Sequence, residues 1–340
     1  MSRTPHPVVI LTPVRNEAWI LDRFLAIAAA CADHVILADQ GSTDGSREIA
    51  ARYPMVTMVA NEGDGYDEAG RQRLLLETAR RIVPGPKVLL ALDADELIAA
   101  DGPSRPSWQT MRTAAPGTVV CFERVDLYLG TERCLRHDDW RPLGYVDDGA
   151  AHEGRAIHSG RVPLPAGAPR LKLNDVRILH YAALRTAAFA AKLRFYSVTE
   201  NVLGTCRPPL KRRLRYLNHL DLALGGRLEA SRREWFAGWE EAGLDMATVD
   251  DPEFSWYDAE VLRAFGRYGT RRFWLDDLWR FDWEAARQWA IAAGYEGMPE
   301  RPVRPCPDWL VWLMRVVAVA HRRQVLVRQR LSGRRSRRFE

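Results

Sequence analysis

Short apolar runs alternate with amphipathic stretches along the first part of the chain. Four runs bounded by polar residues predict buried strands, at 8–14, 34–39, 56–61 and 87–93. Helical spacing predicts helices between them, at 17–32, after a cap at Ser42 or Thr43, and at 67–83. Strands that alternate with helices in this way predict βαβ units and a parallel sheet.

The pattern changes further along the chain. Residues 100–117 are rich in Pro, Gly and charge, a strand is predicted at 118–130, and the irregular stretch 131–178 holds short β pieces at 154–162 and 170–179. Helical patterns dominate 186–295, and nine of the twelve Trp lie between 235 and 312. We expect an α/β class with a mostly parallel central sheet flanked by helices. The expected parts are a nucleotide-binding domain at 1–185, a helical region at 186–306 and a basic tail at 307–340.

Composition indicates a compartment more than a function. Of the 340 residues, 47% are hydrophobic and 27% charged, as in an ordinary soluble globular protein. The N-terminal residues lack a signal-peptide pattern, and no stretch approaches the roughly 20 apolar residues that span a bilayer. The five Cys are scattered without a Cys-x-x-Cys pair, which predicts reduced thiols in a cytoplasmic protein.

The C-terminal tail differs in charge from the rest of the chain. The net charge is +5, but residues 309–340 hold nine Arg and one Glu, or +8, which leaves −3 for residues 1–308. The apolar residues at 309–320 are too few to span a bilayer, but they are enough to lie at its interface or to pack on the body. We expect peripheral contact with an anionic membrane through 307–338.

The fourth apolar run leads directly into three acidic residues, Asp93, Asp95 and Glu96. Adjacent carboxylates repel one another, and burial increases the cost. One interpretation is a helix start with Asp93 or Asp95 as its N-cap. The other is a metal site at the carboxyl end of a parallel strand, where open α/β sheets place their ligands. Spacing alone does not decide, because the "EGD" triplet at 62–64 has similar spacing without a preceding buried strand.

Two other loops also follow predicted strands. The stretch "TPVRNEAW" (12–19) turns into the first helix, so its backbone N–H groups can hold a phosphate or a base edge, with Arg15 and Glu17 directed to the ligand. The alternative is that Asn16 only caps the helix. The stretch "LADQGSTDGS" (37–46) ends the second strand at Asp39, either as an acceptor for a nucleobase N–H or as part of a well-made turn.

Together the three loops resemble those of family 2 glycosyltransferases of the GT-A fold. The family pattern has Pro-x-x-Asn-Glu in the first loop, Asp-x-Gly-Ser-x-Asp-Gly in the second and Asp-x-Asp after a later buried strand, and all three are matched here. The resemblance is strong over residues 7–100 and weaker to about residue 200. There "AAHEGRAIHSG" and "ILHYAALRTAAFAAKLRFYS" are similar to stretches of a subgroup that includes lipopolysaccharide core glucosyltransferases.

The resemblance implies a GT-A, Rossmann-like fold and metal-dependent, inverting transfer of a sugar, with hexosyl transfer expected. The donor would be a nucleoside-diphosphate sugar, UDP-linked in the commonest case, and the acceptor a hydroxyl of a cell-envelope glycan or glycolipid, with a peptide or protein as the alternative. The implied nucleotide-binding residues are Pro13, Arg15, Asn16, Glu17, Asp39, Ser42, Asp44, Asp93 and Ala94.

The resemblance also implies the residues that carry the chemistry. Asp95 would hold Mn²⁺ or Mg²⁺, Asp93 would hold ribose hydroxyls or reach the cation through water, and His180 would meet the metal or the diphosphate. Glu153 would be the general base that takes the acceptor proton. The local alternatives are Asp147 or Asp148 as the base, a loop salt bridge for Glu153 and a structural role for His180.

The sequence departs from the family pattern at two places. Gln40 stands where a second acidic residue is common, which bears on the uridine donor. The insert at 99–117 bears on the register of the acceptor side and on Glu153.

The sequence also bears on other functions and on two further groups of residues. A nucleotidyltransferase would favour a Gly-rich, Lys-containing N-terminal signature, which "TPVRNE" lacks, and a nucleic-acid binder would interleave aromatic residues in its basic tail. We therefore expect no nucleic-acid partner. The Trp-rich region predicts helix packing more than a sugar platform. The basic cluster "RPPLKRRLR" (207–215) is either a solvated face or a site for an acceptor phosphate.

Overall fold

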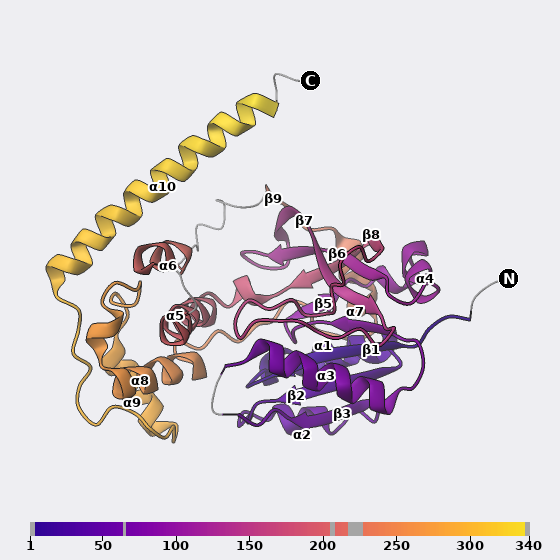
Figure 1. Cartoon of the computed structure of the whole chain (residues 1–340), viewed down its shortest axis with the longest axis horizontal. Coiled ribbons are helices and arrows are strands. Elements are labelled where there is room, and N and C mark those ends of the chain that lie inside the picture. Colours follow the sequence, from indigo (N-terminus) through magenta and orange to yellow (C-terminus); the bar gives the residue numbers. More distant parts are fainter. Residues whose placement is uncertain (1–3, 64–65, 205–207, 217–226, 337–340) are drawn as a thin grey trace. The chain divides into compact units, whose positions relative to one another are not determined.

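The computed structural model describes residues 4–63, 66–204, 208–216 and 227–336 (Figure 1). Two compact units divide the chain: the first comprises Met1–Leu184 and Gly226–Asp250, and the second comprises Arg185–Gly225 and Asp251–Glu340. The first unit therefore includes a segment after residue 225 that the expected division gave to the helical region. Cys206, Arg207 and the acidic Asp64 lie outside the described residues.

The first half of the sheet is parallel, as the alternation predicts. Its strands are β1 (Val8–Val14), β2 (His34–Asp39), β3 (Val56–Ala60) and β4 (Val88–Ala91), in the order β3-β2-β1-β4. The intervening helices are α1 (Ala18–Cys31), α2 (Ser46–Ala50) and α3 (Glu68–Ile82). The chain moves from β1 to β2 and β3 on one side and returns to β4 on the other, which makes the β1–β4 boundary a topological switch point.

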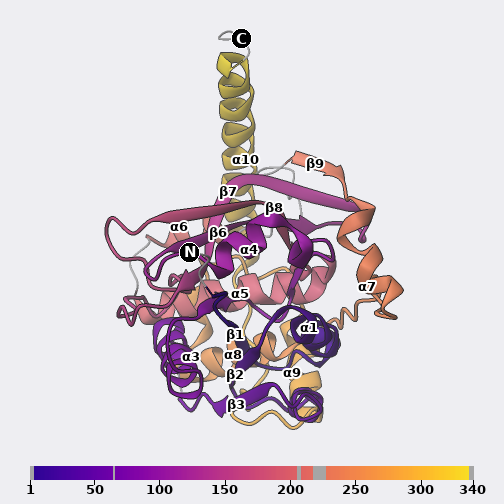
Figure 2. The same ribbon diagram turned by 90° about the vertical axis from the view of Figure 1, so that its right-hand side faces the viewer.

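The two faces of these strands pack against different helices. Val8 and Ile10 of β1 lie in one buried cluster with residues of α1, whereas Val9 and Leu11 lie in another with residues of α3. This alternation follows from the two-residue period of a strand. Figure 2 shows α1 and α3 on opposite sides of β1, β2 and β3. The α/β class with a central sheet flanked by helices is confirmed.

The second half of the sheet is mixed. It adds β7 (Arg133–Val146), β6 (Val119–Leu127), β8 (Arg170–His180) and β5 (Glu96–Ile98) beyond β4, and β9 (Arg227–Ala230) pairs with β7. β7 is antiparallel to β4 and to β6, whereas β6 and β8 are parallel. The prediction that 131–178 is irregular was wrong for β7, and no strand forms at 154–162. The insert forms α4 (Pro106–Arg112).

The second unit is helical, as expected. It contains α5 (Thr186–Leu203), α6 (Pro209–Tyr216), α8 (Trp256–Tyr268), α9 (Trp283–Ala292) and α10 (Asp308–Ser336), while α7 (Ala237–Glu241) lies in the first unit. Trp256 and Trp283 are buried, and Trp279 stacks on Phe265, which confirms helix packing for these residues. No helix in the described ranges is long and apolar enough to cross a membrane.

Two arginines of the basic cluster in α6 differ from both predicted roles of that cluster. Arg212 and Arg213 are buried in ion pairs with Asp276 and Asp277, so neither is a solvated residue or free for a phosphate. Lys211 and Arg215 are exposed.

Candidate functional site

Three loops end the parallel strands at one edge of the sheet. They follow β1, β2 and β4, and the first and third flank the switch point, where open α/β sheets bind their ligands. After β4 the chain makes a tight turn, in which Glu96 N donates to Asp93 O, and then enters β5. Asp93 and Asp95 therefore do not cap a helix, and the helix-start interpretation was wrong.

Two arginines neutralise much of the acidic cluster. Arg161 contacts Glu96 and donates to Asp93 Oδ2 at 2.6 Å, and Arg124 Nη1 lies 3.3 Å from Glu96 Oε1. Burial alone would raise the pKa of Glu96, but the charges of Arg161 and Arg124 outweigh it and lower that pKa to about 2. Glu96 is thus a structural anion, and its partners are guanidinium groups supplied by β6 and by the loop before β8.

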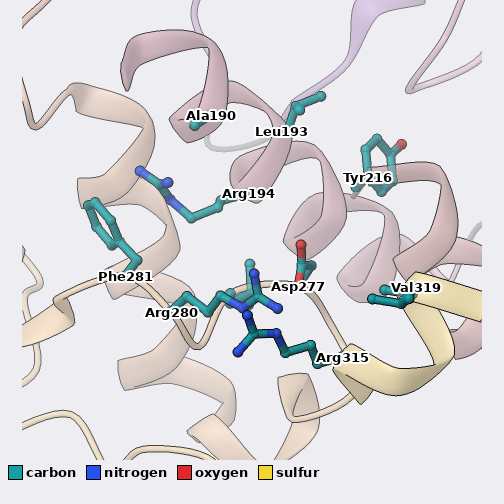
Figure 3. A pocket seen from close by; sticks show the side chains of 11 residues that line it. Ala190, Leu193, Arg194, Tyr216, Asp277, Arg280, Phe281, Arg315 and Val319 are labelled. Atoms are coloured by element: carbon teal, nitrogen blue, oxygen red, sulfur yellow. The ribbon is translucent and has the colours of Figure 1, made fainter. Parts of the chain in front are cut away.

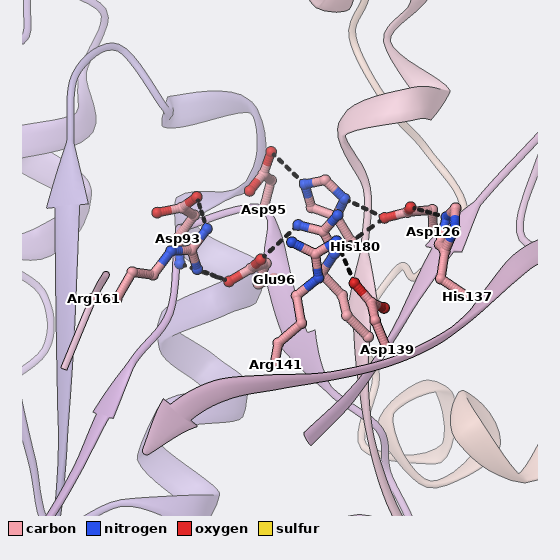
Figure 4. Close-up of polar contacts among 10 residues, drawn as sticks. Asp93, Asp95, Glu96, Asp126, His137, Asp139, Arg141, Arg161 and His180 are labelled. Atoms are coloured by element: carbon pink, nitrogen blue, oxygen red, sulfur yellow. Dashed lines mark hydrogen bonds and ion pairs between the residues drawn. The ribbon is translucent and has the colours of Figure 1, made fainter. Parts of the chain in front are cut away.

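Asp95 and His180 face each other at the end of a chain of polar groups (Figure 4). His180 Nε2 lies 3.6 Å from Asp95 Oδ2, and His180 Nδ1 lies 2.6 Å from Asp126 Oδ1. His137 Nε2 contacts the other oxygen of Asp126 at 2.9 Å. Burial alone would raise the pKa of Asp126, but hydrogen bonds with His137 and His180 and the charge of Arg124 hold it well below its ordinary value. Asp126 is therefore an anion that orients His180.

One oxygen of this site lacks a partner. Asp95 is 8% exposed, and its Oδ1 atom is buried without a hydrogen bond to any described residue. An unpaired buried carboxylate oxygen is costly unless a cation or donor meets it. Carboxylate oxygen suits Mg²⁺ and Mn²⁺, imidazole suits transition metals, and a carboxylate behind the imidazole is a common arrangement for a metal-bound His. Asp95 and His180 therefore fit a divalent cation.

The predicted ligand set is only partly assembled. Asp95 and His180 come together, but the Asp93 carboxylate is held by Arg161. Across the described ranges, no three His, Cys, Asp or Glu side chains form a group that could hold a metal ion. Ala94, between the two aspartates, is buried in the apolar core.

The first loop is fastened by side chains of the second. Asn16 N donates to Ser42 Oγ at 3.0 Å, Glu17 N to Ser46 Oγ at 2.9 Å, and Ala18 N to Asp44 Oδ2 at 2.9 Å. These backbone donors, expected to hold a phosphate or base edge, are thus engaged within the protein. Asn16 does not cap the helix either, because Glu17 is the residue before α1.

Asn16 instead lies in the bend after β1 and links the first loop to the second. Its φ of 56° is left-handed, a conformation that Asn tolerates better than most residues, and its Oδ1 accepts from Thr43 N at 2.8 Å. Pro13 is the β1 partner of Ala38, and Arg15 is partly buried in the bend that follows. The helix after the second loop begins after Gly45, with φ of 96°, and not after Ser42 or Thr43 as predicted.

Asp39 is buried at the end of β2. Its Oδ1 accepts from Ser42 N at 3.2 Å, and its Oδ2 accepts from Arg47 Nε at 2.6 Å. Arg47 is half-exposed, so it can move aside for a ligand at this carboxylate more easily than a buried partner could.

Glu153 lies on an exposed part of the long loop between β7 and β8. Ser159 N donates to Glu68 Oε2, and Glu68 N donates to Ala156 O, so the loop is attached to the start of α3. Arg161 of the same loop reaches Asp93 and Glu96. Within the described residues, Glu153 has no ion pair or hydrogen bond from its side chain, so the proposed loop salt bridge is absent.

The two alternative bases have structural partners. Asp147 is buried and pairs with Lys87 at 2.9 Å and with Arg80 at 2.8 Å. Burial alone would raise the pKa of Asp147, but hydrogen bonds from Arg80 and Lys87 outweigh it and lower that pKa. Asp148 accepts hydrogen bonds from Tyr145 Oη and Ala150 N.

The sequence did not predict four ionisable residues that surround Asp93, Asp95, Glu96 and His180. Arg124 of β6 and Arg161 of a distant loop contact the acidic turn, while Asp126 of β6 contacts His180 and His137 of β7 contacts Asp126. The available signal was Arg124 and Asp126 at alternate positions of β6, a largely apolar strand that also contains Glu123.

Comparison with solved structures finds similar chains of low identity. A mannosyltransferase from Pyrobaculum calidifontis in complex with GDP-Man and Mn²⁺ is 16% identical, with 87% of this chain and 89% of that chain covered and a TM-score of 0.38. A mannosyl-3-phosphoglycerate synthase from Rubrobacter xylanophilus is 18% identical, covers 36% of this chain and 41% of that chain, and has a TM-score of 0.26.

A glucosyl-3-phosphoglycerate synthase from Mycobacterium tuberculosis, in complex with Mn²⁺, UDP and glucosyl-3-phosphoglycerate, is 16% identical. The match covers 36% of this chain and 44% of that chain, with a TM-score of 0.26. The sequence matches no protein-family model and no curated protein. A function for this site must therefore be argued from the residues of this chain.

Proposed function

We propose that this protein is a metal-dependent, inverting glycosyltransferase of the GT-A fold, similar to family 2. The observation that supports this most is the buried, unpaired Oδ1 of Asp95 beside His180, at the carboxyl end of β4 and next to the sheet's switch point. A cation at this position would neutralise the diphosphate of a bound nucleotide sugar. The "ADQGSTDGS" loop at the same edge carries Asp39, the carboxylate expected to meet the base, whereas three backbone donors near "TPVRNE" are engaged by Ser42, Ser46 and Asp44.

The chain's own residues divide the work as follows. Asp95 and His180 would hold Mn²⁺ or Mg²⁺, with the imidazole favouring Mn²⁺ of the two. The cation would stabilise the negative charge that grows on the leaving diphosphate. Asp126 fixes the ring of His180 so that Nε2 faces Asp95. Asp93 would accept hydrogen bonds from ribose after Arg161 turns towards the diphosphate, and Asp39 would accept from the base.

Glu153 is the proposed general base. An acceptor hydroxyl is a poor nucleophile near neutral pH, so its proton must move to a carboxylate as attack proceeds. Glu153 is exposed and unpaired in the described structure, whereas Asp147 is neutralised by two cations. The loop that carries Glu153 is also bound to the acidic turn through Arg161.

The acceptor is proposed to be a hydroxyl of a cell-envelope glycan or glycolipid at the cytoplasmic face of a membrane. The basic, partly apolar tail supports a lipid-borne acceptor, and the four free, buried Cys of the described residues suit a reducing compartment. A peptide acceptor is the alternative.

A screen of nucleotide sugars for metal-dependent hydrolysis tests this function without knowledge of the acceptor. We expect slow release of a nucleoside diphosphate from one donor, most readily from a UDP-sugar with Mn²⁺. CTP and DNA serve as comparison ligands in thermal-stability measurements, because stabilisation by CTP alone would favour a nucleotidyltransferase.

The variant Asp95→Asn should abolish metal-dependent UDP binding and leave the fold intact, because a cation ligand is lost from a buried position. Titration calorimetry with UDP in Mn²⁺ measures the binding. Asp139→Asn is the matched control, since Asp139 is exposed and pairs with Arg141 nearby. If Asp95→Asn binds UDP and Mn²⁺ as the parent does, the proposed metal site is wrong.

A further inference from the structure

A cavity of about 420 Å³ lies within the second unit. Its walls come from α5, the segment before α9 and the first half of α10, with Tyr216 of α6 at one side (Figure 3). The cavity lies wholly in the second unit, and no proposed catalytic residue lines it.

Two of the charged groups around the cavity are already paired. Arg194 Nη2 lies 2.7 Å from Asp258 Oδ1, and its guanidinium is centred 3.6 Å from the ring centroid of Phe281. Asp277 is paired with Arg213 at 2.7 Å. Neither Arg194 nor Asp277 therefore needs a ligand.

Arg280 and Arg315 are different. Figure 3 shows their guanidinium groups next to each other, one from the segment before α9 and the other from α10. Among the described residues, neither has a carboxylate within ion-pair distance. The fold thus brings two exposed like charges together; water screens much of their repulsion, and an anion bound between them would be attracted by both. Guanidinium forks match the oxygens of a phosphate group especially well.

The same cavity has an apolar side. Leu193 and Phe281 line it, together with Ala318 and Val319 of α10. Val319 is exposed, and it shares a helix face with the exposed side chains of Trp312 and Val316. A ligand that meets both arginines therefore also meets an apolar surface.

We propose that this pocket binds the phosphate group of an amphiphilic phosphoester, with Arg280 and Arg315 as the two anion ligands. Such a phosphate comes either from a lipid headgroup or from a soluble phosphorylated molecule. The proposal goes beyond the glycosyltransferase assignment and does not depend on it, because the two sites lie in different units.

Binding measurements on the full chain in phosphate-free, low-salt buffer test the pocket. The probes are inorganic phosphate, a short-chain phosphatidic acid below its micelle concentration, and the matching phosphatidylcholine. The double variant Arg280→Gln/Arg315→Gln should bind phosphatidic acid at least about tenfold more weakly than the parent, since two charge-assisted hydrogen-bonding groups are lost. Both side chains are exposed, so the fold should survive the change.

Arg301→Gln is the matched control, an exposed arginine of the same unit that does not line the cavity. Phosphatidic acid should bind more tightly than inorganic phosphate, because its chains meet the apolar wall, and more tightly than phosphatidylcholine, because its phosphate carries more charge. Equal binding of phosphatidic acid and inorganic phosphate would contradict an amphiphilic ligand. Affinity of the double variant equal to the parent's, or an equal loss in Arg301→Gln, would overturn the proposal. Binding of UDP with Mn²⁺ should be unchanged in the double variant, which separates this site from the donor site.

Discussion

At the scale of single residues, the site consists of acidic groups with different partners. Glu96 is held by Arg161 and Arg124, Asp126 by two histidines, and Asp95 keeps one buried oxygen unpaired. The first two contribute charge that the protein itself neutralises. Of these three residues, Asp95 is the one with a buried oxygen that lacks a partner, so it is the residue that most clearly needs a cation or a hydrogen-bond donor.

Glu153→Gln should separate binding from chemistry. The amide cannot accept the acceptor proton, so we expect transfer to fall by on the order of 10² to 10⁴, while donor affinity stays unchanged. Donor affinity from calorimetry and single-turnover transfer rates measure the two effects. Glu132→Gln, a change at another exposed acidic residue, is the control. An unchanged transfer rate would move the role of base to another residue.

Asp147→Asn should destabilise the protein in a pH-dependent way. The change leaves Lys87, 3% exposed, without a carboxylate partner, at a cost of roughly 3–5 kcal/mol near pH 7. The pKa of Asp147 is lowered in the folded state, so its stabilising effect is present above the unfolded pKa of about 4 and is lost as pH falls through the folded value.

Urea unfolding between about pH 7 and pH 3 measures that dependence. The difference between parent and Asp147→Asn should be largest at neutral pH and shrink below about pH 4. Asp148→Asn, at the exposed neighbouring residue, should change stability little. A difference that stays constant over the whole range would mean that the carboxylate charge of Asp147 does not stabilise the fold.

At the scale of secondary-structure elements, local pattern predicted some parts and not others. The alternation of Val8 to Leu11 with the helices around it predicted β1 to β4 and their parallel pairing. β7 was missed because charged and polar residues interrupt its 14 residues, so they show no two-residue alternation of apolar side chains. The extended conformation of β7 depends on its pairing with β4 and β6, and local sequence does not predict pairing between distant segments.

The same limit applies to the site. Asp93, Asp95 and His180 were found because each ends or follows a recognisable strand, whereas Arg161 lies at 154–162, where a β piece was predicted and a loop forms. The second loop shows the opposite case: Ser42 and Asp44 were expected to contact the nucleotide. Instead Ser42 Oγ and Asp44 Oδ2 accept from backbone N–H groups of the first loop, and Asp44 Oδ1 accepts from Ser46.

Gly144 is the position that lets β7 lie between β4 and β6. A Cβ atom there would come within 2.9 Å of both Leu90 Cδ2 and Val120 Cβ, in a fully packed part of the core. Gly144→Ala should therefore lower the free energy of unfolding by roughly 1–3 kcal/mol, as overpacking does. Gly63→Ala is the control, because a Cβ atom there meets nothing within 4 Å. Equal urea midpoints for both variants would contradict the proposed crowding.

At the scale of the whole molecule, charge and apolar surface concentrate in the C-terminal helix. Within α10, Met314 and Ala318 are buried, but Trp309 and Trp312 are 66% and 65% exposed. Leu313, Val316 and Val319 are exposed as well, and their spacing places them with the two Trp on one helical face. Packing therefore accounts for one face of residues 308–320 and leaves an apolar face uncovered.

Liposome sedimentation of the full chain and of a chain lacking 321–340 tests the use of this surface. The deletion removes eight Arg and retains the exposed Trp residues and the cavity at Arg315. Each Arg near an anionic leaflet contributes roughly 1 kcal/mol, and salt screens that attraction. Neutral liposomes and high salt are the matched controls.

We expect the full chain to sediment with anionic liposomes at low salt, and the truncated chain to stay in solution with its donor hydrolysis retained. The proposed catalytic residues lie in the first unit and the deleted residues in the second, so loss of membrane contact should not remove the donor chemistry. Interfacial Trp alone would bind anionic and neutral liposomes equally, whereas the Arg-rich segment requires anionic lipid. Equal sedimentation of the two chains, or equal binding to neutral liposomes, would remove the membrane assignment and favour a soluble acceptor.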